Sequence, residues 1–323
     1  MRPRRLRSIA LAGLVAAGLG GALAWAGSAS AHSPVGSARS PVGTVGGVGI
    51  FTESCRYSHS AGADPILMPG MTGMSMQHDF FGNTTTNASS TAATLAAGPT
   101  TCSTSADASA YWAPALYQNR TRLTPLRSVI YWRVSGPAAA SVHTMPAGLS
   151  MIAGDESATT PQGRRRVSWT CTGADGTGPR VHTDVPHGCA AGASLKVTIA
   201  FPSCWDGTTL NGATQRNVVY PSRRACPAGH PVRIPELVFH AIYPTSSAAG
   251  LTLSTGPDST GSINSEHADF LNAFAPAPLG RDVSSCLVGR VRCGHVRGPE
   301  ATPASARRGN ARAGQHRGHG QAS

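Results

Sequence analysis

The sequence predicts a mostly β protein: a single antiparallel sandwich or jelly-roll-like domain with long loops, stapled by disulfides. Short runs of β-branched and aromatic residues alternate with polar ones, and Pro, Gly and Ser clusters separate these runs. Few segments show the 3.6-residue period of a helix. Eight cysteines follow an apparent export signal, as in disulfide-stabilised secreted domains. These three observations define the expected class.

The first 31 of the 323 residues have the composition of a secretory signal peptide. Four arginines precede an apolar stretch over residues 9–26, and Ala29–Ala31 form a small-residue cleavage site. An uncleaved anchor is the alternative, since about 18 apolar residues suffice to span a bilayer. We expect cleavage, a secreted or extracellular product and no stable membrane span afterwards. Residues 32–49, rich in Gly, Ser, Pro and Val, are predicted to form a flexible linker.

The β domain is predicted to occupy residues 50–282. Strands are expected over residues 128–134, 166–171, 195–201 and 236–243, where β-branched and aromatic residues are frequent. Residues 266–274 form either one short helix or an extended segment. Residues 283–323 are expected to be a basic tail, disordered from about residue 297 because large apolar side chains are almost absent there.

The net charge of +12 resides mostly at the two ends of the chain. Four arginines within residues 1–31 and a net +6 from Arg281 onward leave the body with only +2. A nucleic-acid-binding domain carries its basic residues on the folded surface. The charge distribution therefore argues against a nucleic-acid partner, and the basic tail is either solvated chain or a loose contact to an anionic surface.

The eight cysteines are expected to form four disulfides. Eight cysteines allow 105 pairings, so the sequence does not determine the connectivity. Pairing neighbours along the chain is the simplest arrangement: Cys55–Cys102, Cys171–Cys189, Cys204–Cys226 and Cys286–Cys293. Zinc is the alternative, but the chain lacks a C-x-x-C pair.

Several catalytic signatures are absent from the sequence, among them G-x-S-x-G, H-E-x-x-H and the P-loop. The first third instead carries a polar constellation, "CRYSHSAGADPILMPG…MSMQHDFFGN". Later come "YWAPALY", "PAGLSMIAGD", "WTC", "FPSCWDG", "CPAGHPVRIPEL" and "HADFLNAF". In this order the blocks resemble a secreted family of actinobacteria and fungi, domain of unknown function 1996, over about residues 50–282. The resemblance implies an exported protein associated with the cell wall, and no established reaction.

The resemblance also singles out polar residues as candidate catalytic or ligand-binding groups. Met76 departs from the family pattern, because it stands where a first histidine of an H-x-H pair is common. The matching positions are His59, Asp64, His78, Asp206, His230, His267 and Asp269.

A copper or other divalent-metal site is one interpretation of this region. Met74, Met76 and His78 are spaced by two, so on a strand they would share one face. Thioethers and imidazole suit copper(I). The alternative is that the methionines fill gaps in the core or line a loop. Signal cleavage would also leave His32 at the amino terminus, where amine and imidazole together chelate copper, although linker residues surround it.

A glycan hydrolase with two carboxylates is another interpretation, with Asp64, Asp79, Asp206 and Asp269 as candidates. Asp in D-P and D-G pairs commonly organises a turn instead. His78 and Asp79 would point to opposite faces of a strand. His267 and Asp269 would share a face only if their segment is extended.

Aromatic residues are candidates for stacking on sugars, with core packing as the alternative. They are Tyr111, Trp112, Trp132 and Trp205. The sequence therefore predicts a cleft lined by His59, Asp64, His78 and the Asp206 and His267 blocks. This cleft is expected to engage wall or extracellular polysaccharide, either as a binding protein or as an enzyme.

Overall fold

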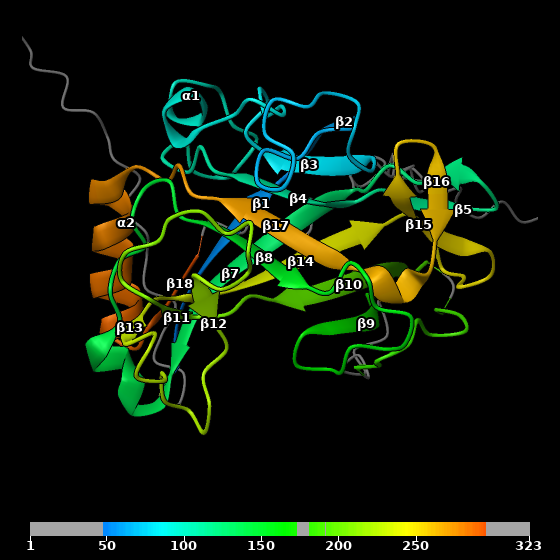
Figure 1. Ribbon diagram of the computed structural model, residues 1–323. Helices are drawn as coiled ribbons and strands as arrows, with labels where there is room; N and C mark the ends of the chain where they lie inside the picture. The colour runs from blue at the N-terminus through cyan, green and yellow to red at the C-terminus, as the bar shows by residue number, and fades with distance from the viewer. Residues whose placement is uncertain (1–47, 173–180, 191, 295–323) are drawn as a thin grey trace, which may run out of the picture. The chain divides into compact units, whose positions relative to one another are not determined.

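Two large sheets form the body of the protein in a computed structural model that describes residues 48–172, 181–190 and 192–294 (Figure 1). The six-stranded sheet has the order β18-β1-β7-β14-β10-β9, and the five-stranded sheet has the order β2-β3-β4-β17-β8. Neighbouring strands are antiparallel, except that β18 joins β1 in parallel. The predicted mostly β, antiparallel class is confirmed.

The strand bounds of the large sheets are as follows. The six-stranded sheet contains β1 (Val48–Cys55), β7 (Arg127–Ser135), β9 (Val167–Thr172), β10 (Ser194–Ala200), β14 (Glu236–Tyr243) and β18 (Arg292–Gly294). The five-stranded sheet contains β2 (Tyr57–Ala61), β3 (His78–Gly82), β4 (Ala110–Pro114), β8 (Ser150–Gly154) and β17 (His267–Leu271).

Two smaller sheets and five short helices complete the described elements. One small sheet has the order β16-β15-β5-β6 and the other has the order β12-β11-β13. Their strands are β5 (Leu116–Gln118), β6 (Thr121–Arg122), β11 (Cys204–Trp205), β12 (Val218–Val219), β13 (Val232–Arg233), β15 (Leu251–Gly256) and β16 (Ser259–Gly261). The helices are α1 (Ala92–Ala96), η1 (Gly136–Ser141), η2 (Ile263–Ser265), α2 (Pro276–Asp282) and η3 (Val283–Val288).

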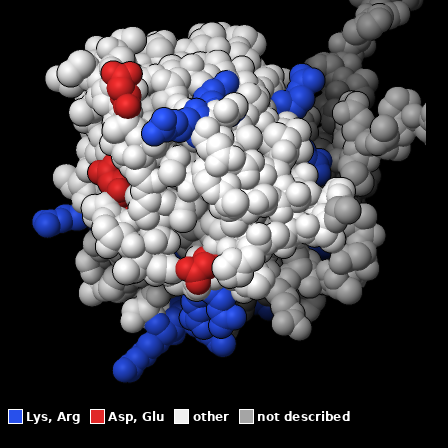
Figure 2. Space-filling model, turned by 90° about the vertical axis from the view of Figure 1, so that its right-hand side faces the viewer, with Lys and Arg blue, Asp and Glu red and all other residues white. Residues whose placement is uncertain are grey.

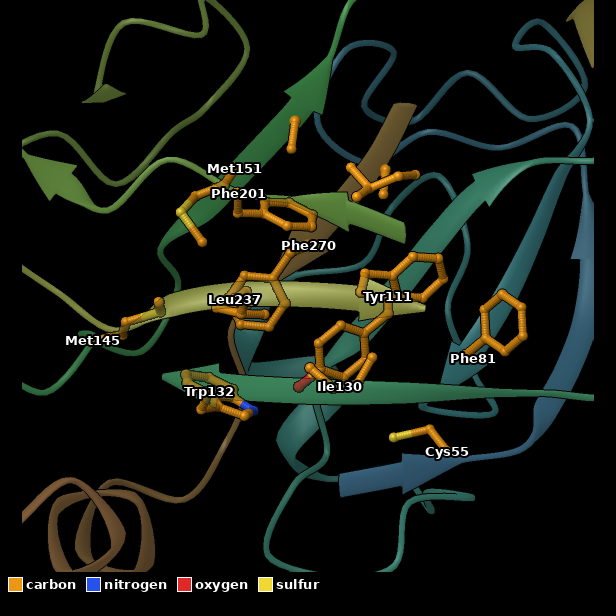
Figure 3. Close-up of a cluster of buried hydrophobic side chains, with 14 of the residues drawn as sticks. Cys55, Phe81, Tyr111, Ile130, Trp132, Met145, Met151, Phe201, Leu237 and Phe270 are labelled. Atoms are coloured by element: carbon orange, nitrogen blue, oxygen red, sulfur yellow. The ribbon is translucent and has the colours of Figure 1, made fainter. Parts of the chain in front are cut away.

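The main core lies between the two large sheets (Figure 3). Phe270 of β17 contacts Trp132 of β7 edge-on, with ring centroids 5.8 Å apart. Phe81 of β3 meets Phe239 of β14 in the same way at 5.4 Å. These side chains point into the space between the sheets because every second residue of a strand points to the same face. The inward faces of the two sheets therefore bury one continuous apolar layer.

A second, smaller core covers the opposite face of the five-stranded sheet. Phe80 and Trp112 point to this face, and their rings lie 5.7 Å apart. Ala63 and Ile66, from the segment between β2 and β3, and Leu95 of α1 cover them. Both faces of the strands β3, β4 and β17 are thus packed, so the polar side chains of these three strands are buried in the protein interior.

Four disulfides confirm the predicted neighbour pairing. Cys55 bonds to Cys102, Cys171 to Cys189, Cys204 to Cys226, and Cys286 to Cys293. All eight cysteines are therefore used as covalent links, and a cysteine-ligated zinc site is excluded.

Residues 266–274 were expected to form either a short helix or an extended segment; residues 267–271 form a strand, because β17 hydrogen-bonds to β4 on one side and β8 on the other. The structure differs from the sequence-based expectation at the C-terminal end of the domain. Residues 283–294, expected in the tail, form η3 and β18, and Cys286–Cys293 links them beside β1. The signal, most of the linker and the tail from residue 295 lie outside the described residues. Among the described helices, none is long and apolar enough to cross a membrane.

A pH-dependent contribution to stability is expected from His240 on β14, whose ring packs 4.8 Å from that of Tyr131. Burial, and then the positive charges of Lys196 and Arg133, lower the pKa of His240 to about 3. The unfolded chain takes up a proton near pH 6.5, which the folded chain does not bind until about pH 3. Stability should therefore fall as pH drops through this window, by at most about 1.4 kcal/mol per pH unit from this group.

The measurement is urea unfolding of the wild type and of His240→Gln between about pH 7 and pH 4. The wild type should lose stability relative to the variant as the pH falls, because glutamine does not titrate. A difference between the two proteins that stays constant with pH would contradict this assignment.

Candidate metal centre

Three of the predicted site residues converge on one face of the five-stranded sheet. His78 is the first residue of β3, and His267 and Asp269 lie two apart on β17, so alternation gives the latter pair the same face. β4 lies between these strands, with Pro114 opposite His78 and Trp112 opposite Asp269. One ligand atom from each of the three residues lies within 4.8 Å of the others, and all three side chains are buried. We call this group the histidine centre.

Backbone carbonyls fix the orientation of both imidazoles. His78 Nδ1 lies 3.0 Å from the carbonyl oxygen of Ala63, and His267 Nδ1 lies 2.9 Å from that of Ser265. A carbonyl oxygen only accepts, so each Nδ1 carries the proton and donates it. Each neutral ring therefore keeps an unprotonated Nε2, which is the arrangement that ligating histidines adopt in metal sites.

The remaining polar atoms of the histidine centre lack hydrogen-bond partners. His78 Nε2 and both carboxylate oxygens of Asp269 are buried and make no hydrogen bond. His267 Nε2 is 3.7 Å from Asp269 Oδ2, which is beyond hydrogen-bond distance. Buried polar atoms of native proteins nearly always have a partner, which includes a bound ion. These unpartnered atoms are therefore candidates to bind one ligand in common.

The buried environment favours the uncharged forms of the two histidines and disfavours the ionised form of Asp269. Burial lowers the pKa of His78 to about 3 and also lowers the pKa of His267. Burial, and then the charges of Asp64 and Glu156, raise the pKa of Asp269 well above its usual range. At neutral pH the histidines are neutral, so this is not a charged His–Asp ion pair. A bound cation would stabilise the ionised form of Asp269.

Asp64 and Gly154 support the histidine centre from neighbouring segments. Asp64 lies in the segment between β2 and β3 and is almost fully buried. Its Oδ1 accepts hydrogen bonds from the backbone N–H groups of Ile66 and Leu67. Its charge nevertheless acts on both His267 and Asp269. Gly154 pairs with His267, has a φ of +99°, and would place a Cβ 2.8 Å from the His267 Cα. Glycine is therefore required beside His267.

Three other candidate site residues use their polar atoms locally and are not part of the histidine centre. His59 contacts Ser58 Oγ through Nδ1 and the Thr86 carbonyl through Nε2. Asp206 Oδ1 accepts from the N–H groups of Thr208 and Thr209, as the turn alternative predicted. His230 Nε2 lies 2.6 Å from the Arg216 carbonyl. Of the residues expected to line a cleft, His78, His267 and Asp269 therefore converge, whereas His59 and Asp206 do not join them.

The predicted methionine ligands and aromatic platforms also need correction. Met74 lies in a turn with 60% of its surface exposed, and Met76 precedes β3, so strand alternation does not align them with His78. Tyr111, Trp112 and Trp132 are completely buried in the two cores and present no ring face to a sugar. Trp205 is partly exposed, and its Nε1 donates to the Thr209 carbonyl.

Asp79 points away from the histidine centre, as alternation after His78 predicted. Its Oδ1 accepts from Ser60 Oγ and from Arg122 Nη1, the latter at 2.9 Å. Burial raises the pKa of Asp79 to about 6 despite these two partners. Arg122 could not be identified as this partner from the sequence, because no local pattern connects β6 with β3.

A comparison with known families matches the chain to one family model over residues 64–274. No curated protein matches the chain, and no solved structure matches it. The matched range contains Asp64, His78, His267 and Asp269, and it covers more than half of the chain. The chain therefore belongs to the family described as domain of unknown function DUF1996.

Proposed function

We propose that this protein binds one divalent transition-metal ion at the histidine centre, through His78 Nε2, His267 Nε2 and the Asp269 carboxylate. The observation that carries the proposal is that these buried ligand atoms lie within 4.8 Å of one another. The Nδ1 atoms of the two histidines are hydrogen-bonded to backbone carbonyls, which leaves each Nε2 directed to the shared position. Ligand atoms around one zinc ion are roughly 3–4 Å apart, so small side-chain rotations suffice to close the site.

The donor set favours a borderline metal such as zinc(II) or iron(II). Two imidazole nitrogens and one carboxylate suit these ions, whereas copper(I) prefers thiolate and thioether sulfur. Three protein ligands also leave coordination positions for water or a small oxygen ligand. When bound, such an ion would act as a Lewis acid on that oxygen ligand. The two histidines and Asp269 would hold it, and the buried surroundings would exclude bulk water.

Secretion and contact with polysaccharide are the wider setting that we propose for this metal-binding domain. The chain has four disulfides, and disulfides form and persist mainly in oxidising compartments such as the cell exterior. Over most of the face shown in Figure 2, charged side chains are few and separate. Such a surface suits a neutral polymer better than a polyanion. A hydrolase with two aspartates is less favoured, because Asp64 and Asp206 both organise local turns.

Metal analysis of the full chain, purified without a histidine tag, tests the proposal. After dialysis against a chelator, the protein is titrated separately with zinc(II), iron(II), manganese(II), copper(II) and calcium(II), and bound metal and thermal unfolding are measured. We expect one equivalent of zinc or iron per chain. The metal should also stabilise the fold by about 2.7 kcal/mol at 100 times its Kd. The proposal fails if no transition metal binds stoichiometrically and none raises the Tm.

A further inference from the structure

A turn formed by two arginines lies beside the small sheet β12-β11-β13, which is labelled at the lower left of Figure 1. Ser222 and Ala225 exchange both backbone hydrogen bonds, each at 2.9 Å, so Arg223 and Arg224 are the central residues of a two-residue turn. The φ angles of the two arginines are +48° and +70°. Turns with positive φ at both central positions strongly prefer Asn-Gly, Asp-Gly or Gly-Gly, because larger side chains crowd the backbone there. The chain therefore has two arginines where the backbone conformation disfavours them.

Two links hold this turn in place. Cys226, which closely follows the turn, is bonded to Cys204 of β11. Arg233 of β13 donates a hydrogen bond from Nη2 to the carbonyl oxygen of Arg224, at 2.9 Å. An unfavourable backbone conformation persists only where the surrounding structure enforces it, and such positions are frequent at ligand-binding sites. We call Arg223, Arg224 and Arg233 the arginine cluster.

The positive charge of the arginine cluster is not balanced by acidic side chains. Arg223 and Arg224 are exposed, and within the described residues neither takes part in an ion pair. Glu236 is the acidic residue whose charge acts on Arg233. Both carboxylate oxygens of Glu236 already accept hydrogen bonds from Arg133, at 2.8 and 3.1 Å. The cluster therefore combines three guanidinium groups with an acidic neighbour that is already paired.

We propose that the arginine cluster binds an anionic polymer through the phosphate or carboxylate groups of that polymer. A guanidinium group fits either oxyanion, since its planar fork donates two parallel hydrogen bonds. A turn that is already rigid loses little conformational freedom on binding, which favours affinity. A polymer suits the cluster better than a single small anion, because exposed ion pairs are individually weak and several must act together. The cluster lies outside the five-stranded sheet, so this binding does not depend on the histidine centre.

Replacing the two arginines with the residues that the turn prefers separates binding from folding. In Arg223→Asn/Arg224→Gly the backbone conformation is a favoured one, so the Tm should equal or exceed that of the wild type. The full chain is titrated at low ionic strength with polyphosphate and, separately, with polygalacturonate. We expect saturable binding of at least one polymer, weakened by added salt, and the polymer that binds identifies the oxyanion. The variant should bind it about tenfold more weakly, as expected for the loss of two exposed ion pairs.

Arg56→Gln/Arg120→Gln is the matched control, because it removes the same charge from two exposed arginines elsewhere in the fold. This control should bind the polymer as the wild type does. The proposal is wrong if neither polymer binds the wild type, or if the turn variant keeps the wild-type affinity. An equal loss of affinity in the control would also overturn it, because binding would then follow net charge alone. If the turn variant does not fold, Arg223→Gln/Arg224→Gln provides the same comparison.

Discussion

Replacing His267 with alanine is expected to abolish stoichiometric transition-metal binding. The substitution removes one of two nitrogen ligands whose Nδ1 is already fixed by the Ser265 carbonyl. Losing a residue that merely orients a ligand typically costs about 10–100-fold in metal affinity, so losing the ligand itself should cost more. His78→Ala should behave in the same way. The measurement is metal content after dialysis, with titration of the chelator-treated protein by zinc(II).

His59→Ala is the matched control for these two variants. His59 also lies in the five-stranded sheet, and its ring stacks on Phe80 at 4.9 Å, but both of its nitrogens contact neighbouring groups. It should therefore keep the metal affinity of the wild type. Equal loss of zinc in His59→Ala and His267→Ala would show that the binding site is not the histidine centre.

Replacing Phe270 with alanine is expected to be strongly destabilising. Phe270 is fully buried, and its ring centroid lies 5.1 Å from Tyr111, 5.8 Å from Trp132 and 6.4 Å from Phe201. Truncating such a side chain costs about 3–5 kcal/mol, because the cavity between the sheets refills only in part. Denaturant unfolding with the disulfides intact should show this loss, and the Tm should fall by roughly 10 °C.

The control for Phe270→Ala is Leu210→Ala, which truncates an apolar side chain with 40% of its surface exposed. Its stability should stay within about 0.5 kcal/mol of the wild type. If Phe270→Ala were as stable as Leu210→Ala, the two sheets would not share the tightly packed core described above.

Local sequence patterns predicted much of the fold. Alternation in residues 195–201 placed Leu195, Val197 and Ile199 on one face, and all three are buried in the main core. The same two-residue period correctly separated His78 from Asp79. The nearest-neighbour disulfide pairing was also confirmed, although it rested on simplicity and not on any measured proximity.

The candidate site was predicted only in part. His78, His267, Asp269 and Asp64 were all named from the sequence, but so were His59, Asp206 and His230, which bond locally.

Local sequence was sufficient for the secondary-structure class and for the relative faces of nearby residues, because strand alternation depends only on neighbours in the chain. Tertiary structure decided which strands meet. His78 and His267 come together because β4 pairs with both β3 and β17 in one register, and a one-residue slip of either strand would turn its ligand to the other face. It also decided that Trp112 is buried and that 267–271 is extended. Both depend on contacts between segments far apart in the chain, which no local pattern specifies.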